Sequence, residues 1–105
     1  MKIVTKYPPQ PEDHILKLLH QFDMEFAPRL SKRTDLIEYA KKLAQNAVWF
    51  LTYEEEHVTG HCAAYMNRSD YAYISSIAVK KNAQGMGIGS RIWEHIEYEA
   101  VKRGM

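Results

Sequence analysis

Residues 77–91 read IAVKKNAQGMGIGSR, and this segment holds more structural information than any other part of the chain. An apolar strand that ends at Val79 runs into a glycine-rich turn, which leads directly into a helix. Gly85, Gly87 and Gly89 stand at alternate positions, so the backbone can approach a ligand closely and turn several N–H groups the same way. Those amides meet the positive end of the helix dipole. The segment therefore predicts a site for phosphate or pyrophosphate.

Three better-known phosphate loops do not fit this segment. A P-loop needs Gly-Lys-Ser/Thr, and the sequence has no such triplet. A Rossmann fingerprint needs G-x-G-x-x-G, whereas residues 85–89 read GMGIG. A kinase glycine loop lies between antiparallel strands, whereas this loop opens a helix. A glycine-rich connection without any ligand stays open as the alternative.

Working outward, the sequence predicts alternating strands and amphipathic helices. Apolar residues at helical spacing (Ile15, Leu18, Leu19, Phe22) give a helix, and Asp35 with Glu38 resembles a capping box that begins a second one. Gly60 is the expected position of a bulge. The predicted elements are strands over 2–7, 48–53, 58–67 and 71–79, and helices over 12–22, 35–45 and 87–103. This order predicts an α+β domain with a mainly antiparallel sheet.

Composition limits the class of protein. The 105 residues predict one domain, and 46% hydrophobic with 26% charged residues is the balance of a globular protein. A net charge of +1 indicates neither a nucleic-acid nor a membrane partner, and the longest apolar run, residues 47–51, is too short to span a bilayer. The single cysteine, Cys62, fits a reducing cytoplasm. The five histidines lack metal-binding spacing, so we expect no metal.

The sequence ends at Gly104-Met105, directly after the last predicted helix. An α/β architecture would normally send the next strand back to the sheet, so we expect a fold that is truncated at its C-terminus. The strand over 71–79 would then present an open edge, and we expect a homodimer through that edge as one way to pair it.

The pattern Gln84-x-x-Gly87-x-Gly89, after a strand that ends at Val79, resembles the coenzyme A motif of the GCN5-related N-acetyltransferase (GNAT) superfamily, Arg/Gln-x-x-Gly-x-Gly/Ala. The flanking order of strand, helix pair, hairpin, long strand, motif and helix is also similar. The resemblance is strongest over residues 71–105. It implies a single, partial acyl-CoA N-acyltransferase domain over residues 1–105, with a GNAT-like, mainly antiparallel mixed sheet, helices packed on it and the C-terminal strands lacking.

The resemblance also implies an activity and a set of site residues. The activity is transfer of an acetyl group from acetyl-CoA to a primary amine of a small molecule or peptide. A backbone N–H near Ile77 would polarise the thioester carbonyl, and a bulge at Ser75 and Ser76 would free that amide. Tyr73 and Ser75 would face the acceptor amine. The residues implied to bind the cofactor are Ile77, Ala78, Val79, Gln84, Gly85, Met86, Gly87, Ile88, Gly89 and Ser90.

Simpler roles stand beside these. Tyr73 and Ser75 are equally compatible with ordinary cross-strand packing. Cys62, next to two alanines, is expected to be a buried apolar residue rather than a nucleophile. His57 and His61 are not expected to bind metal. Two further functions also stay open, a non-catalytic acyl-CoA-binding module and a protein-interaction module.

Overall fold

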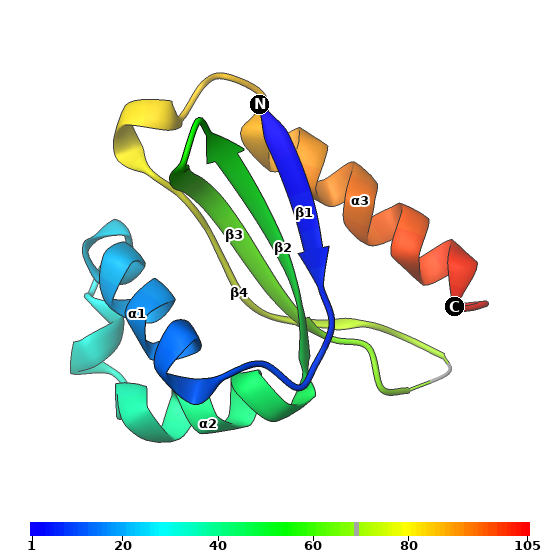
Figure 1. Cartoon of the computed structure of the whole chain (residues 1–105), viewed down its shortest axis with the longest axis horizontal. Coiled ribbons are helices and arrows are strands. Elements are labelled where there is room, and N and C mark those ends of the chain that lie inside the picture. The colour runs from blue at the N-terminus through cyan, green and yellow to red at the C-terminus, as the bar shows by residue number, and fades with distance from the viewer. Residues whose placement is uncertain (69) are drawn as a thin grey trace.

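Four strands form one antiparallel sheet, and their order across the sheet follows the chain, β1-β2-β3-β4 (Figure 1). The computed structural model describes residues 1–68 and 70–105. The strands are β1 (Lys2–Lys6), β2 (Ala47–Glu54), β3 (His57–Tyr65) and β4 (Tyr73–Val79). In the described part of the chain, β4 is therefore an edge strand whose outer side has no neighbouring strand.

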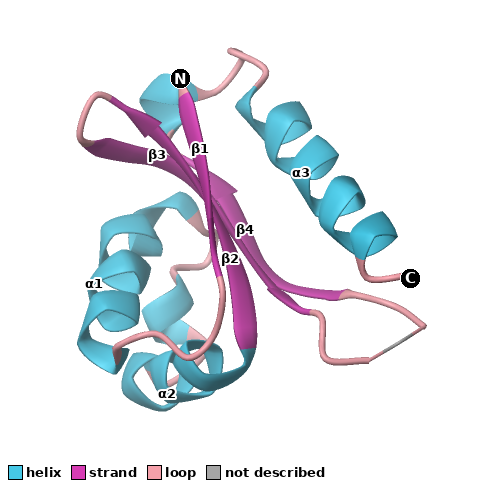
Figure 2. Cartoon of the chain, turned by 45° about the vertical axis from the view of Figure 1, so that its right-hand side comes forward, coloured by secondary structure: helices cyan, strands magenta, loops and turns pink. Residues whose placement is uncertain are grey.

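Three α-helices cover the two faces of this sheet (Figure 2). They are α1 (Glu12–Phe22), α2 (Leu36–Asn46) and α3 (Ile88–Lys102), with 3₁₀ turns at Asp23–Glu25, Leu30–Lys32 and Lys81–Ala83. Helices α1 and α2 lie on one face, and α3 lies on the other. As predicted, the Asp35 carboxylate accepts hydrogen bonds from the amides of Ile37 (2.9 Å) and Glu38 (3.4 Å) and begins α2.

The interior strand β2 contributes side chains to two hydrophobic cores, one on each face of the sheet. Trp49 and Leu51 pack toward α1 and α2, whereas Val48 and Phe50 pack toward α3. Both faces of β2 are thus removed from water, which explains why its sequence is continuously apolar instead of alternating.

The predicted fold class and element order are confirmed, and the differences lie at element ends. The last two strands are shorter than expected: β3 ends at Tyr65 instead of residue 67, and β4 begins at Tyr73 instead of residue 71. Tyr71 is 50% exposed and adds no cross-strand pair. The sequence Asn-Arg-Ser-Asp at residues 67–70 is typical of a turn, and Ser69 within it lies outside the described residues.

The bulge expected at Gly60 lies one residue earlier. Thr52 pairs with Gly60 and Tyr53 pairs with Val58, which leaves Thr59 as the extra residue. Gly60 itself is required by close packing, because a Cβ there would lie 2.8 Å from Thr52 Oγ1 and 3.0 Å from Ile88 Cγ2. The glycine thus lets α3 approach the sheet.

Candidate functional site

A small pocket of about 240 Å³ lies where β4 passes into α3. Most of the residues that the sequence singled out for cofactor binding line it, and Ile77, Ala78 and Met86 do not. The Met86 side chain is 64% exposed. The lining residues are Val79, Ala83, Gln84, Gly85, Gly87, Ile88, Gly89 and Ser90.

The backbone amides around this pocket find no acceptor in the part of the chain that the structure describes. Within residues 1–68 and 70–105, no carbonyl or side chain accepts a hydrogen bond from the amides of residues 85–90. The first bond of α3 runs from the Arg91 amide to the Gly87 carbonyl (3.1 Å). The first turn of α3 has no side-chain cap and no acidic residue, in contrast to α2. The positive end of α3 is therefore open to an anion.

The three glycines of the loop have different reasons to be glycine. Gly85 (φ 84°) and Gly87 (φ 77°) adopt the left-handed backbone conformation, which residues other than glycine rarely adopt. Gly89 is helical, and a Cβ added there would meet nothing within 4 Å. Neither backbone conformation nor packing within the chain requires glycine at 89, so its missing side chain leaves room for a ligand at the helix end.

Gln84 and Ile88 contribute less directly than the sequence suggested. The Gln84 side chain donates a hydrogen bond to the Val79 carbonyl (3.1 Å), and its amide donates to the Lys81 carbonyl (3.4 Å). Gln84 thus closes the loop, and its amide is already used. The Ile88 side chain is 3% exposed and belongs to the α3 core, so only its amide faces the pocket.

The outer edge of β4 presents backbone groups in a definite order. The Lys80 amide donates to the Thr59 carbonyl (2.8 Å), which makes this a hydrogen-bonded position of the β3–β4 pair. Because such positions alternate along an antiparallel pair, the amides of Val79 and Ile77 point away from β3. The Ile77 side chain is 42% exposed. An extended ligand along this edge would meet those two amides.

A bulge interrupts β4 where the resemblance to the GNAT superfamily implied one. Ala63 pairs with Ser76 and Ala64 pairs with Ile74, so Ser75 is the extra residue. Both serines are held by side chains of the α1/α2 face. The Tyr39 hydroxyl of α2 donates to the Ser75 carbonyl (3.0 Å) and lies 2.6 Å from Ser75 Oγ.

The second serine of the bulge has a buried partner. His61 Nε2 lies 2.8 Å from Ser76 Oγ, and His61 is 1% exposed. Sequence reasoning missed Tyr39 entirely and considered His61 only as a metal ligand. Nothing in the spacing of Tyr39 distinguishes it from other aromatic residues on a helix face.

Tyr73 lies on the same face of the sheet, near the bulge. Its ring stacks on that of Tyr65 at 6.2 Å between centroids, and its side chain is 60% exposed. Burial raises the pKa of Tyr39 and of Tyr65, so both hydroxyls keep their protons at neutral pH. The structure thus gathers the hydroxyl-bearing side chains of Tyr39, Tyr65, Tyr73 and Ser75 beside the β4 edge.

Other candidate residues have structural surroundings. Burial raises the pKa of the Cys62 thiol to about 12, so Cys62 is no thiolate nucleophile. Among the described residues, no group of three or more side chains is arranged to hold a metal ion. Nor does that part of the chain contain a helix long and apolar enough to cross a membrane.

Near the loop, the Lys80 side chain and the Lys81 backbone amide are engaged with the α1 end of the molecule. Lys80 donates to the Gln21 carbonyl and lies over the Phe22 ring (4.5 Å to the centroid), so it ties the end of β4 to α1. The Lys81 amide donates to a carboxylate oxygen of Glu25 (3.0 Å). Arg91 is exposed, in the first turn of α3.

Comparison with known proteins gives one family and several similar folds. The family model described as "Acetyltransferase (GNAT) family" matches residues 13–105. An aminoglycoside acetyltransferase from an uncultured soil metagenomic sample, solved in complex with sisomicin, is 23% identical, with a TM-score of 0.74 over 99% of this chain and 72% of that chain. No curated protein sequence matches the chain.

Two further solved structures share this fold. A ribosomal-protein-alanine N-acetyltransferase from Brucella melitensis is 18% identical, with a TM-score of 0.64 over 98% of this chain and 74% of that one. An aminoglycoside 6'-N-acetyltransferase complexed with coenzyme A is 15% identical, with a TM-score of 0.73 over 99% of this chain and 57% of that one. At these identities the likeness shows the fold.

Proposed function

The chain belongs to the GNAT family of acetyltransferases, and on that premise we propose that it transfers an acetyl group from acetyl-CoA to a primary amine of a small molecule or peptide. The observation that carries the proposal is a set of backbone amides, at residues 85–90, for which the described residues supply no acceptor and which surround a glycine-lined pocket at the uncapped end of α3. Several N–H donors and a helix dipole in one place favour a pyrophosphate.

The chain's own groups suggest how acetyl-CoA would be bound and activated. The loop amides would bind the pyrophosphate, and the outward amides of Val79 and Ile77 would pair with the pantetheine arm as an added strand does. The Ile77 amide would donate to the thioester carbonyl oxygen, where negative charge develops as the amine attacks. Tyr73 and Ser75 would face the acceptor. The acetyl thioester supplies the activated acyl group.

The binding half of the proposal is tested by titrating acetyl-CoA calorimetrically into the chain and into Gly89→Val. A valine at this open position should occupy the space for the pyrophosphate and weaken binding at least tenfold, about 1.4 kcal/mol. The matched control is Glu97→Val, which adds the same side chain at an exposed position of α3. Unchanged affinity in folded Gly89→Val would show that the pyrophosphate binds elsewhere.

The catalytic half is tested by release of free coenzyme A thiol in the presence of amines of different classes. The amines would be sisomicin, a peptide with N-terminal alanine and a lysine-containing peptide. Two of the similar solved structures are an aminoglycoside acetyltransferase in complex with sisomicin and a ribosomal-protein-alanine N-acetyltransferase, which motivates the first two amines. Amine-dependent thiol release supports transfer. Tight binding of acetyl-CoA without release for any amine would favour a non-catalytic acyl-CoA-binding module instead.

A further inference from the structure

Two side chains from distant elements hold the β4 bulge from the same side. Tyr39 of α2 precedes Ser75 by 36 residues and contacts both its carbonyl oxygen and its hydroxyl. His61 of β3 contacts the hydroxyl of the next residue, Ser76. Each residue of the bulge thus has its own partner on the face of the sheet that α1 and α2 cover, Tyr39 from α2 and His61 from the neighbouring strand.

His61 has surroundings that would suit an apolar ring better than an imidazole. Its ring lies edge-on to Phe22, at 4.5 Å between centroids, and 5.5 Å from Trp49. Within the described residues, Nδ1 is buried and has no hydrogen-bond partner. Leaving a buried polar atom unpaired is unfavourable, and a phenylalanine would avoid it. Among the described residues this ring has one hydrogen bond, to Ser76, so that bond is the evident reason for a histidine here.

The bulge decides which backbone groups of β4 reach the open edge. An extra residue changes the side-chain alternation of a strand, so the Ser75 and Ser76 side chains both lie on the face of the sheet that α1 and α2 cover. The next residue, Ile77, then directs its amide away from β3. If the bulge moved toward Val79 and past Ile77, the inward and outward groups of the residues it passed, Ile77 included, would be exchanged.

We propose that Tyr39 and His61 are positioning residues for acetyl transfer. By holding Ser75 and Ser76, they fix the bulge in place. The fixed bulge in turn keeps the Ile77 amide aimed along the edge at the acetyl carbonyl. This inference rests on the proposed function, since the carbonyl belongs to acetyl-CoA.

The first test compares the affinities of acetyl-CoA and coenzyme A, and it needs no acceptor. A hydrogen bond from Ile77 to the acetyl carbonyl should make acetyl-CoA bind about threefold to tenfold more tightly than coenzyme A. In Tyr39→Phe and in His61→Phe this ratio should fall toward one, with the affinity for coenzyme A within about twofold of the original. Tyr53→Phe, which removes a hydroxyl from β2 on the same face, should leave the ratio unchanged.

The second test separates positioning from simple stability. Melting temperatures of both variants should stay within about 5 °C of the original, since each change removes one hydrogen bond and little volume. In the ligand-free chain, the NMR resonance of the Ile77 amide should shift in both variants and not in Tyr53→Phe. His61→Gln, whose amide reaches toward the position of Nε2, should restore part of the acetyl-CoA preference. Ser76→Ala replaces His61→Phe if that variant does not fold.

The outcomes distinguish a failure of the positioning role from a failure of the proposed acetyl transfer. An unshifted Ile77 resonance, or an unchanged affinity ratio in both variants, would overturn the positioning role and leave the proposed acetyl transfer intact. If the original chain bound neither coenzyme A nor acetyl-CoA, the proposed function would fail and this role would fail with it.

Discussion

Gly87 and Gly89 lie two residues apart, and glycine is favoured at the two positions for different physical reasons. Gly87 is the N-cap of α3 and has the left-handed conformation, so glycine at this position is required by the backbone conformation. Gly89 is in the first turn of the helix with open space around it, so its glycine serves no purpose within the chain itself. The two positions therefore separate stability from ligand binding.

Alanine at these two positions should change stability in opposite directions. Gly87→Ala should lower the free energy of unfolding by about 1–2 kcal/mol, because a Cβ disfavours the left-handed conformation. Gly89→Ala should raise it by up to about 1 kcal/mol, because alanine favours the helix. Urea unfolding of the two variants and the original chain measures both. Equal destabilisation would show that Gly89 has a structural role which the open space around it does not reveal.

The roles of the loop residues could be predicted from the sequence, whereas the residues that hold the bulge could not. The roles suggested for Gly85 and Gly87 follow from local chain geometry, which a sequence pattern records. The contacts of Tyr39 and His61 depend on how α2 and β3 come to lie beside β4, and no local pattern records that. A histidine buried among aromatic rings indicates a specific hydrogen-bonding role, but the aromatic neighbours of His61 are known only from the fold.

At the scale of elements, α2 and α3 begin in opposite ways. The amides at the start of α2 are satisfied by Asp35, whereas those at the start of α3 have no partner from the described chain. The sequence indicated both, because a capping residue and a glycine loop are local features. The bulge at Ser75 was implied by the family resemblance. The bulge read from the residues alone was placed on Gly60 instead of Thr59, because a glycine needed for packing resembles a glycine needed for a bulge.

The cap of α2 should be worth a measurable part of the stability. Asp35→Ala removes an acceptor from the amides of Ile37 and Glu38, and we expect a loss of about 1 kcal/mol in the free energy of unfolding. Lys42→Ala, at an exposed interior position of the same helix, should change it by much less. Denaturant unfolding of the two variants compares them, and equal effects would mean that the cap contributes nothing.

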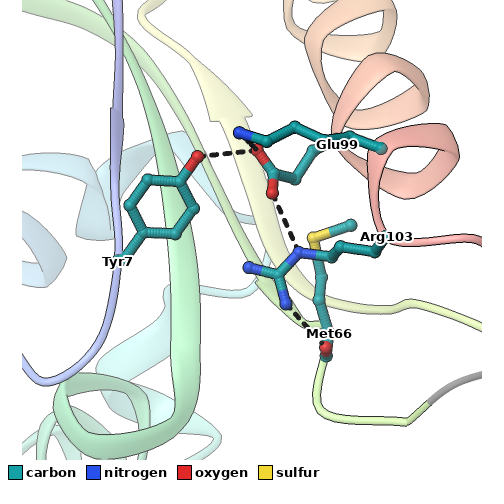
Figure 3. A network of polar contacts seen from close by, with 5 residues as sticks. Tyr7, Met66, Glu99 and Arg103 are labelled. Atoms are coloured by element: carbon teal, nitrogen blue, oxygen red, sulfur yellow. Dashed lines mark hydrogen bonds and ion pairs between the residues drawn. The ribbon is translucent and has the colours of Figure 1, made fainter.

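At the scale of the whole molecule, one carboxylate ties three segments together (Figure 3). Glu99 of α3 is 5% exposed and accepts hydrogen bonds from Tyr7, after β1 (2.8 Å), and from Arg103 (2.9 Å). Arg103 also donates to the Met66 carbonyl, after β3 (3.0 Å). These bonds fix the C-terminal end of α3 on the sheet, while its other end carries the pocket. Glu99 was not predicted from the sequence, although a charged residue that continues the apolar stripe of Ile92 and Ile96 could have indicated this network.

Glu99 should make stability depend on pH. Burial alone would raise the pKa of Glu99, but the hydrogen bonds from Tyr7 and Arg103 outweigh it and hold the pKa below its ordinary value. Because the folded-state pKa is lowered, this contribution is complete above the pKa of the unfolded chain and is lost as the pH falls through the folded-state pKa.

Replacing this carboxylate tests the network. Glu99→Gln should lower the free energy of unfolding by about 1–3 kcal/mol at neutral pH, and the difference from the original chain should shrink in acid. Glu97→Gln, exposed on the same helix, should show little effect at either pH. Unfolding curves at several pH values decide this, and a difference that did not change with pH would mean that the charge of Glu99 is not involved.

The most direct measurement for the whole account follows the backbone amide resonances by NMR while coenzyme A is added. The account predicts saturable shifts that are largest for the free amides of residues 85–90, with the Ile77 and Val79 amides at the β4 edge shifting in the same titration. Saturable shifts confined to other parts of the chain, or no shift at millimolar coenzyme A, would contradict it.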